Sequence, residues 1–107
     1  MTNATQTTAA ARALAALGHE ARLDLYRLLV RAGPDGLIVG ELAELTGLPG
    51  STLSHHLRTL VSARLVRQAR RGREVVNRAD FDTMTRTLSF LTDQCCQGIS
   101  IVSEDAA

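Results

Sequence analysis

The chain has 107 residues, enough for one domain with a modest hydrophobic core and too few for two. Its formal net charge is +1, but all twelve cationic residues are arginine and they are unevenly distributed. Seven of the twelve lie between residues 58 and 78, where Glu74 is the one acidic residue. A nearly neutral protein therefore carries a local basic patch, as nucleic-acid-binding proteins do.

No apolar run of about 18 residues is present, which argues against a membrane-spanning helix. The first ten residues, MTNATQTTAA, lack the basic and apolar regions of a signal peptide. Two adjacent cysteines cannot cross-link a fold, which fits a reducing compartment. We therefore expect a cytoplasmic protein.

The first third of the chain predicts two helices. Residues 1–8 are polar and are expected to be frayed. Residues 10–18 (AARALAALG) are rich in Ala and Leu and end at Gly18, which is typical of a helix with a glycine after its last turn. In residues 19–33 apolar side chains recur every three or four positions, so we expect an amphipathic helix that ends at Gly33-Pro34. A turn and a short extended segment, residues 37–39, follow.

The next two segments have the pattern of a helix-turn-helix motif. Residues 40–47 predict a two-turn helix with Leu42 and Leu45 facing inward, and it ends at Gly47. Residues 51–63 (STLSHHLRTLVSA) predict a second helix whose buried face is Leu53, Leu57, Leu60 and Val61. Its opposite face carries side chains suited to base edges and phosphates in a major groove, which are Ser51, Thr52, Ser54, His55 and Arg58. For His56, packing and DNA contact remain equally open.

A hairpin is predicted directly after this helix, which is the winged form of the motif. Two β-prone runs, 65–69 and 74–77, flank Arg71-Gly72, and Gly72 can adopt the positive φ of a tight turn. We expect Arg70, Arg71 and Arg73 at the hairpin tip to contact phosphates or an adjacent minor groove.

The last predicted helix begins with Asp80 as its cap and ends at Gly98. Along it an apolar seam recurs at steps of three and four residues, formed by Phe81, Met84, Leu88, Leu91 and Cys95. Because one DNA-binding module covers few phosphates, we expect a homodimer through the first and last helices, with part of each face also serving the core. Residues 99–107 are expected to be frayed.

The predicted fold is a single domain over residues 1–107, mainly α with a small β-hairpin wing, a dimeric winged helix-turn-helix. No set of catalytic residues is present, so an enzyme is not expected.

Residues 51–78 (STLSHHLRTLVSARLVRQARRGREVVNR) resemble the recognition helix and wing of ArsR/SmtB-type bacterial repressors. The likeness continues upstream in residues 16–29 (ALGHEARLDLYRLL) and covers about residues 12–97. It implies a transcriptional repressor that binds double-stranded operator DNA as a homodimer. One departure is Arg64, where the family usually has glycine; a left-handed Arg64 would cost about 1 kcal/mol.

Residues 90–96 (FLTDQCC) resemble the arsenical-sensing subgroup, which carries its thiols at the end of the last helix. The resemblance implies that arsenite or methylarsenite binds Cys95 and Cys96 and releases the operator, with no cofactor required. The subgroup uses three cysteines and this chain has two, so inorganic arsenite needs a third ligand, whereas two thiolates satisfy a methylated arsenical.

Other roles for the cysteines stay open. They can be small buried hydrophobic residues of a repressor that responds to another signal or to none. A redox pair is less favoured, because a disulfide between neighbours is strained and a helix C-terminus disfavours a thiolate. Zinc is not expected, since the chain has only His19, His55 and His56 and no histidine after Asp80. Use of the winged helix for protein contacts alone is disfavoured by the unopposed arginines.

Overall fold

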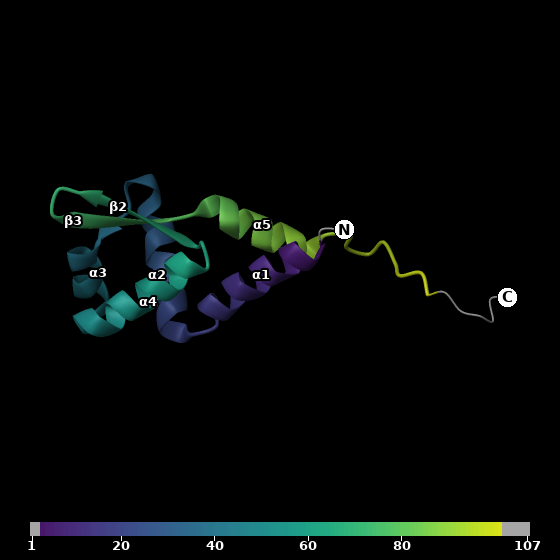
Figure 1. Ribbon diagram of the computed structural model, residues 1–107, viewed down its shortest axis with the longest axis horizontal. Coiled ribbons are helices and arrows are strands. Elements are labelled where there is room, and N and C mark those ends of the chain that lie inside the picture. Colours follow the sequence, from purple (N-terminus) through teal and green to yellow (C-terminus); the bar gives the residue numbers. More distant parts are fainter. Residues whose placement is uncertain (1–2, 102–107) are drawn as a thin grey trace.

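The computed structural model describes residues 3–101 and shows a mainly helical chain with a three-stranded antiparallel sheet (Figure 1). This confirms the predicted winged helix-turn-helix architecture. The elements in chain order are α1 (Asn3–Leu17), α2 (Glu20–Ala32), the 3-10 turn η1 (Gly33–Asp35), β1 (Leu37–Ile38), α3 (Val39–Thr46), α4 (Gly50–Ser62), β2 (Val66–Arg71), β3 (Glu74–Ala79) and α5 (Phe81–Thr92).

Glycines and a histidine set the limits of the central helices. Gly33 has φ 72° and its N–H bonds to the carbonyls at the end of α2, and Gly47, with φ 69°, ends α3 in the same way. His19 caps α2, because its Nδ1 accepts a hydrogen bond from Ala21 N at 3.2 Å. The helix α1 differs from expectation: it already begins at Asn3, so most of the stretch predicted as frayed, residues 1–8, is helical.

The core lies where α2, α3 and α4 meet the base of the sheet. Its largest fully buried side chains are mostly leucines and come from all three helices, from the start of β2 with the residue before it, and from β3. They are Leu25, Leu29, Leu42, Leu53, Leu60, Leu65, Val66, Val76 and Asn77. The inward placement predicted for Leu45 is wrong, since this side chain is 60% exposed while Leu42 is fully buried. The helix α3 has only eight residues, and Leu42 is its buried residue, so the side chain of Leu45 stays in solvent.

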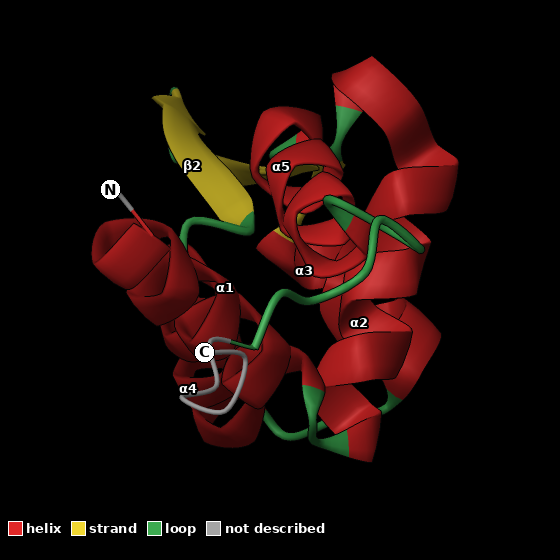
Figure 2. Cartoon of the chain, turned by 90° about the vertical axis from the view of Figure 1, so that its right-hand side faces the viewer, coloured by secondary structure: helices red, strands yellow, loops and turns green. Residues whose placement is uncertain are grey.

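The sheet has the order β1–β3–β2, so the hairpin gains a short third strand beyond the prediction. Asn77 on β3 joins all three strands. Its side chain is fully buried, donates to Leu37 O on β1 at 3.2 Å and accepts from Gln68 Nε2 on β2 at 2.7 Å. Figure 2 shows strand β2 standing out to one side of the helices.

Helices α1 and α5 lie side by side and extend away from this core (Figure 1). They pack through Thr83 and Thr87 of α5, which are buried, and the Thr87 hydroxyl donates to Thr83 O at 2.8 Å. Asp80 caps α5 as predicted, accepting from Asp82 N and Thr83 N. The predicted end at Gly98 is wrong, because α5 ends at Thr92. Among residues 3–101 no helix is long and apolar enough to cross a membrane.

Candidate nucleic-acid interface

Helix α4 has two chemically different faces. Leu53, Leu57 and Leu60 are buried as predicted, and Val61 is half-buried. Of the side chains predicted to face DNA, Thr52 is half-buried and the other four are exposed, namely Ser51, Ser54, His55 and Arg58. The outward face of α4 therefore carries hydroxyl, imidazole and guanidinium groups, which can pair with base edges and phosphates.

His56 belongs to the buried face. It is 6% exposed, and its ring lies 4.8 Å from that of His19, between centroids. Arg22 Nη1 lies 3.5 Å from His56 Nδ1, and Arg22 Nε donates to Ala16 O. Because arginine only donates, Nδ1 must accept, which requires a neutral imidazole with its proton on Nε2. Burial lowers the pKa of His56, and the nearby charges of His19, Arg22 and His55 lower it further.

His56 and Arg22 thus tie α4 to α1 and α2. Of the two roles that the sequence left open for His56, packing and DNA contact, the buried position favours packing. Sequence reasoning did not single out Arg22, because a local pattern carries no signal for such a partner. Arg22 and His56 are 34 positions apart and meet only through the helix packing.

The turn after α4 sets the direction of the hairpin. Arg64 has φ 63°, the left-handed conformation that favours glycine, and its N–H donates to Val61 O at 2.9 Å. The next residue, Leu65, donates to Leu60 O at 3.0 Å. These two hydrogen bonds hold the end of the recognition helix against the start of β2.

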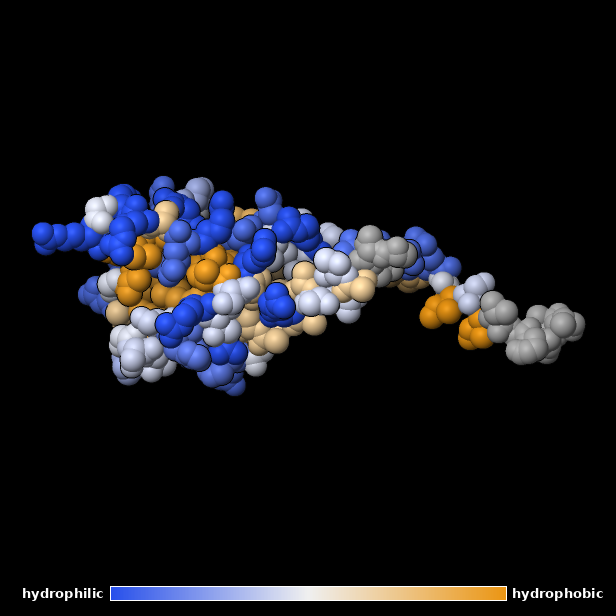
Figure 3. Space-filling model, viewed as in Figure 1, coloured by the Kyte–Doolittle hydropathy of each residue, from blue (hydrophilic) through white to orange (hydrophobic). Residues whose placement is uncertain are grey.

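The wing places most of its arginines in solvent. The strands β2 and β3 are joined by the two-residue turn Gly72-Arg73, with Gly72 at φ 64° as predicted. Arg71 Nη2 lies 3.6 Å from Glu74 Oε1 across the turn, an exposed pair that neutralises little. Arg70 and Arg73 form no ion pair with any residue in 3–101. Figure 3 shows the hairpin end of the molecule as hydrophilic.

Two other arginines of the basic run have structural partners. Arg67 and Arg78 are directly opposite each other on β2 and β3, which would be unfavourable for two like charges. Arg67 Nε lies 3.8 Å from Asp80 Oδ2, and Arg78 Nε donates to Pro34 O at 2.7 Å. Arg78 therefore fastens the 3-10 turn to the sheet.

The two cysteines follow α5 in a series of turns. Both thiols are free and exposed, and their Sγ atoms are 3.2 Å apart. Gln94 and Cys96 each have φ 63°, so the chain leaves the helical path and does not keep the divergence of adjacent helical side chains. The predicted position of Cys95 on a helical seam is therefore wrong, and no buried packing role is left for either thiol within the described protomer.

No group of three or more His, Cys, Asp or Glu side chains that could hold a metal ion occurs within residues 3–101. The sulfur separation does fit one thiophilic atom. Two thiolate bonds of about 2.3 Å, the length seen with zinc, can meet at a single atom between sulfurs 3.2 Å apart.

Helices α3 and α4, the turn between them and the hairpin that follows define a winged helix-turn-helix protein. A family model described as "Helix-turn-helix domain" matches residues 17–69. No curated protein sequence matches the chain. An ArsR-like transcriptional regulator from Rhodococcus sp. RHA1 is similar in structure, with TM-score 0.71 and 26% identity over 79% of this chain and 77% of that chain.

Two further solved structures are similar over nearly the whole chain. One is the transcriptional repressor BigR from Xylella fastidiosa, with TM-score 0.64 and 27% identity over 91% of this chain and 100% of that chain. The other is the homodimeric winged helix-turn-helix DNA-binding domain of a possible ArsR-family regulator from Mycobacterium bovis, with TM-score 0.69 and 24% identity over 95% and 94% of the two chains. The chain is thus similar, in fold and over most of its length, to winged helix-turn-helix transcriptional regulators of the ArsR type.

Proposed function

We propose that this chain is a homodimeric, sequence-specific repressor that inserts α4 into the major groove of operator DNA and rests its wing tip on the flanking backbone. The observation that carries the proposal is that the DNA-facing end of α4 and the basic tip of the wing lie on the same side of the molecule. The N-terminal end of α4 and the hairpin tip lie at the same end of the molecule, opposite the α1–α5 pair (Figure 1). Ser54, His55 and Arg58 then read bases, while Arg70 and Arg73 bind phosphates.

The apolar seam on α5 supports a dimer. Phe81, Leu88 and Leu91 are 44%, 56% and 53% exposed in the protomer, although they recur at the spacing of a helix–helix contact. A second copy packed on this seam covers them and places two copies of α4 about a two-fold axis. The similar domain from Mycobacterium bovis is a homodimer.

The paired thiols support a trivalent arsenical as the inducer. Arsenic(III) is a soft centre that prefers thiolate ligands, and the Cys95 and Cys96 sulfurs are exposed and close enough to share one atom. Two thiolates complete the coordination of methylarsenite, so this arsenical is the better match for a two-cysteine site.

Release of DNA follows from linkage between the two sites. The thiols come three residues after α5, directly beyond the seam that joins the proposed dimer. A ligand that fixes this segment in a conformation compatible with only one arrangement of the two protomers changes the spacing of the two α4 helices. Tenfold derepression requires about 1.4 kcal/mol of coupling between ligand and DNA.

The test is a fluorescence-anisotropy titration of labelled operator DNA with the wild-type protein and with Cys95→Ala/Cys96→Ala. Methylarsenite is expected to release DNA from the wild type and not from the double variant, with arsenite weaker than methylarsenite. Release from both proteins, or from neither, would contradict arsenical sensing. Failure of any duplex to compete better than non-specific DNA at moderate salt would contradict the repressor itself.

A further inference from the structure

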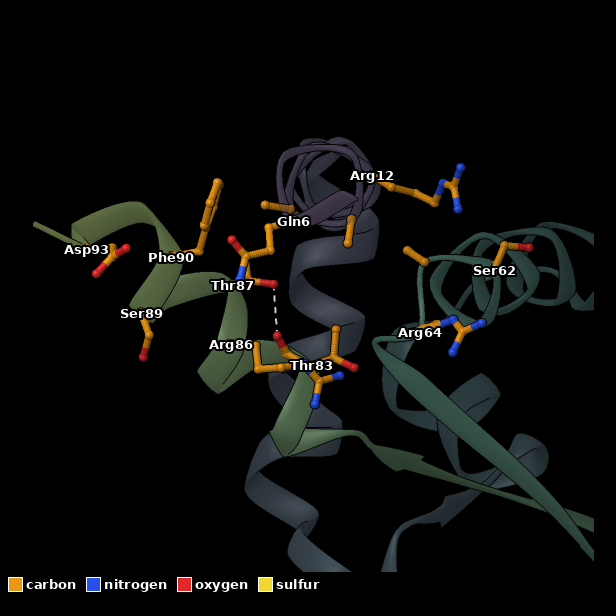
Figure 4. Close-up of a pocket in the computed structure, with 13 residues that line it drawn as sticks. Gln6, Arg12, Ser62, Arg64, Thr83, Arg86, Thr87, Ser89, Phe90 and Asp93 are labelled. Carbon is orange, nitrogen blue, oxygen red and sulfur yellow. Dashed lines mark hydrogen bonds between the residues drawn. The ribbon is translucent and has the colours of Figure 1, made fainter. Parts of the chain in front are cut away.

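A pocket lies apart from the proposed DNA surface, and neither thiol lines it. It has a volume of about 370 Å³, is partly open to solvent, and is bordered by α1, α5 and the turn between α4 and β2 (Figure 4). This is within the range of about 300 Å³ and above that small-molecule sites occupy. We propose that it binds a small organic anion, a carboxylate carried on a flat apolar body.

The charge of the lining residues favours an anion. Arg12, Arg64 and Arg86 reach the pocket from three different elements, and Asp93 is the one acidic residue that lines it (Figure 4). None of the three arginines forms an ion pair within residues 3–101. A guanidinium group presents paired N–H donors that match a carboxylate.

An unpartnered hydroxyl points to a ligand independently of the charge. Thr83 lines the pocket and is 8% exposed, and its buried Oγ1 has no hydrogen-bond partner within the described chain. In Figure 4 this oxygen points away from the α5 axis, toward the side on which Arg64 lies. A buried hydroxyl without a partner costs free energy, which a ligand oxygen bound at this point would recover.

Most of the wall's surface is apolar, although Gln6, Ser62, Thr87 and Ser89 also line it. The Phe90 ring and the methyl groups of Ala10 and Ala63 line the pocket beside the polar groups. Few polar groups in a mostly apolar cavity are the pattern of a site for a small organic molecule, since the apolar part supplies burial and the polar part sets orientation. Inorganic anions would leave the apolar wall uncovered.

A second copy on the apolar seam leaves this pocket available. Successive residues of a helix are rotated by about 100°, so Phe81 and Leu88 lie on a different face of α5 from Thr83, Thr87 and Phe90. Leu91, four residues after Thr87, lies next to the pocket-facing residues. A second copy centred on Phe81 and Leu88 therefore leaves the pocket open. Its wall includes Arg64, so an occupied site contacts the turn that joins the recognition helix to the wing.

The experiment measures 2-naphthoate binding to the full-length protein by calorimetry and by amide chemical shifts, with the uncharged 2-naphthamide as the matched ligand. Saturable binding of the acid is expected, with shifts concentrated at residues 63–64 and 83–90, and the amide should bind at least about fivefold more weakly because it lacks the charge-assisted hydrogen bond. No DNA or arsenical is present, so the result is independent of the proposed repressor function.

Two variants localise the site. Arg86→Gln should weaken 2-naphthoate binding by about fivefold, whereas Arg31→Gln on α2 should leave it unchanged. Thr83→Val should also weaken binding while keeping or raising the melting temperature, because it replaces an unpartnered hydroxyl with a methyl group of the same shape. Absence of saturable binding, equal binding of acid and amide, or equal binding by the wild type and both pocket variants would overturn the proposal.

Discussion

Arg64 is the residue at which the chain departs most clearly from the ArsR/SmtB pattern that it resembles, and its backbone is strained. Its φ of 63° is the conformation that the family resemblance anticipated for a position usually held by glycine. Such a conformation costs an ordinary residue about 1–2 kcal/mol. Its guanidinium group also lines the pocket between α1 and α5, so the strain is retained in the wall of the proposed anion site.

Arg64→Gly should therefore stabilise the fold. Relief of the left-handed strain, less the extra entropy of glycine in the unfolded chain, predicts a gain of up to about 1 kcal/mol. Urea unfolding would show this as a higher midpoint at unchanged slope. Ala63→Gly, at the neighbouring φ of −85°, should instead destabilise. A lower midpoint for Arg64→Gly would contradict the assignment of strain.

Asn77 is a polar residue on which the sheet depends. Asn77→Ala removes the side-chain bonds to β1 and β2 and leaves buried partners unsatisfied, so the free energy of unfolding should fall by about 2 kcal/mol. Gln68→Ala, which deletes the exposed partner, should cost less than half as much. Chemical denaturation of both variants would decide, and an equal loss in the two would show that the buried amide does not join the strands.

His56 makes the stability of the fold depend on pH. Burial depresses the pKa of its imidazole below the ordinary value of 6.5, so the unfolded chain binds a proton more readily than the folded one. The free energy of unfolding should therefore fall as pH drops below about 6.5 toward the folded-state pKa, by at most about 1.4 kcal/mol per pH unit for one proton. His56→Gln should flatten this dependence, and the exposed His55→Gln should retain it. An unchanged pH profile in His56→Gln would contradict the neutral buried imidazole.

At the scale of elements, the wing is expected to contribute to the affinity for DNA but little to the preference for a particular sequence. Arg73 lies at the hairpin tip, without an ion pair in the described chain, and is placed to meet a phosphate. In a dimer, Arg73→Gln removes two phosphate contacts and should lower the slope of log affinity against log salt by about 1.8. Anisotropy titrations from low to moderate salt measure this slope.

The salt experiment has a control on the same protein. Arg31→Gln on α2, which is exposed and far from the hairpin in the sequence, should leave the slope unchanged. The ratio between selected and random DNA should also be nearly unaffected by Arg73→Gln, since phosphate contacts carry little sequence information. A loss of discrimination without a change of slope would place Arg73 on the bases.

Glycines and capping residues in the sequence predicted where most helices and strands begin and end. The boundaries that were missed depend on contacts between elements. Gly33 and Gly47 end their helices as predicted, Gly72 takes the positive φ expected of it, and Asp80 caps α5. The end of α5 was not predictable, because no breaking residue marks Thr92. Residues 91–101 are all exposed, and packing supplies most helical stability.

The site was predictable to a similar extent. The two faces of α4 followed from its periodicity, as did the tip of the wing, and the roles of these residues toward DNA stay predictions. The partners of His56 and Arg78 are remote in sequence, so local pattern gives no sign of them. Thr83 and Thr87 were missed because threonine counts as polar, although the Thr87 hydroxyl donates to Thr83 O and can therefore be buried.

At the scale of the whole molecule, the proposed dimer joins two copies through α5. Leu88→Glu places a charge in the centre of the proposed seam and should convert the dimer to a monomer, with loss of operator affinity by at least about tenfold, since one module covers half of the phosphates. Sedimentation equilibrium and anisotropy measure the two effects. Leu45→Glu is the matched control, because Leu45 is 60% exposed, close to the 56% of Leu88, but lies on α3. A dimer that survives Leu88→Glu would contradict this interface.

The central claim is that two α4 helices read DNA about a two-fold axis. Selection of binding sites from a pool of random duplexes tests it most directly, since the pool contains every candidate operator of a given length. The expected result is an enriched pseudo-palindrome whose half-sites are separated by about one helical turn, 10–10.5 base pairs, or a multiple of it, and Ser54→Ala/Arg58→Ala should abolish the enrichment. A pool that is not enriched, or an enriched site without two-fold symmetry, would contradict it.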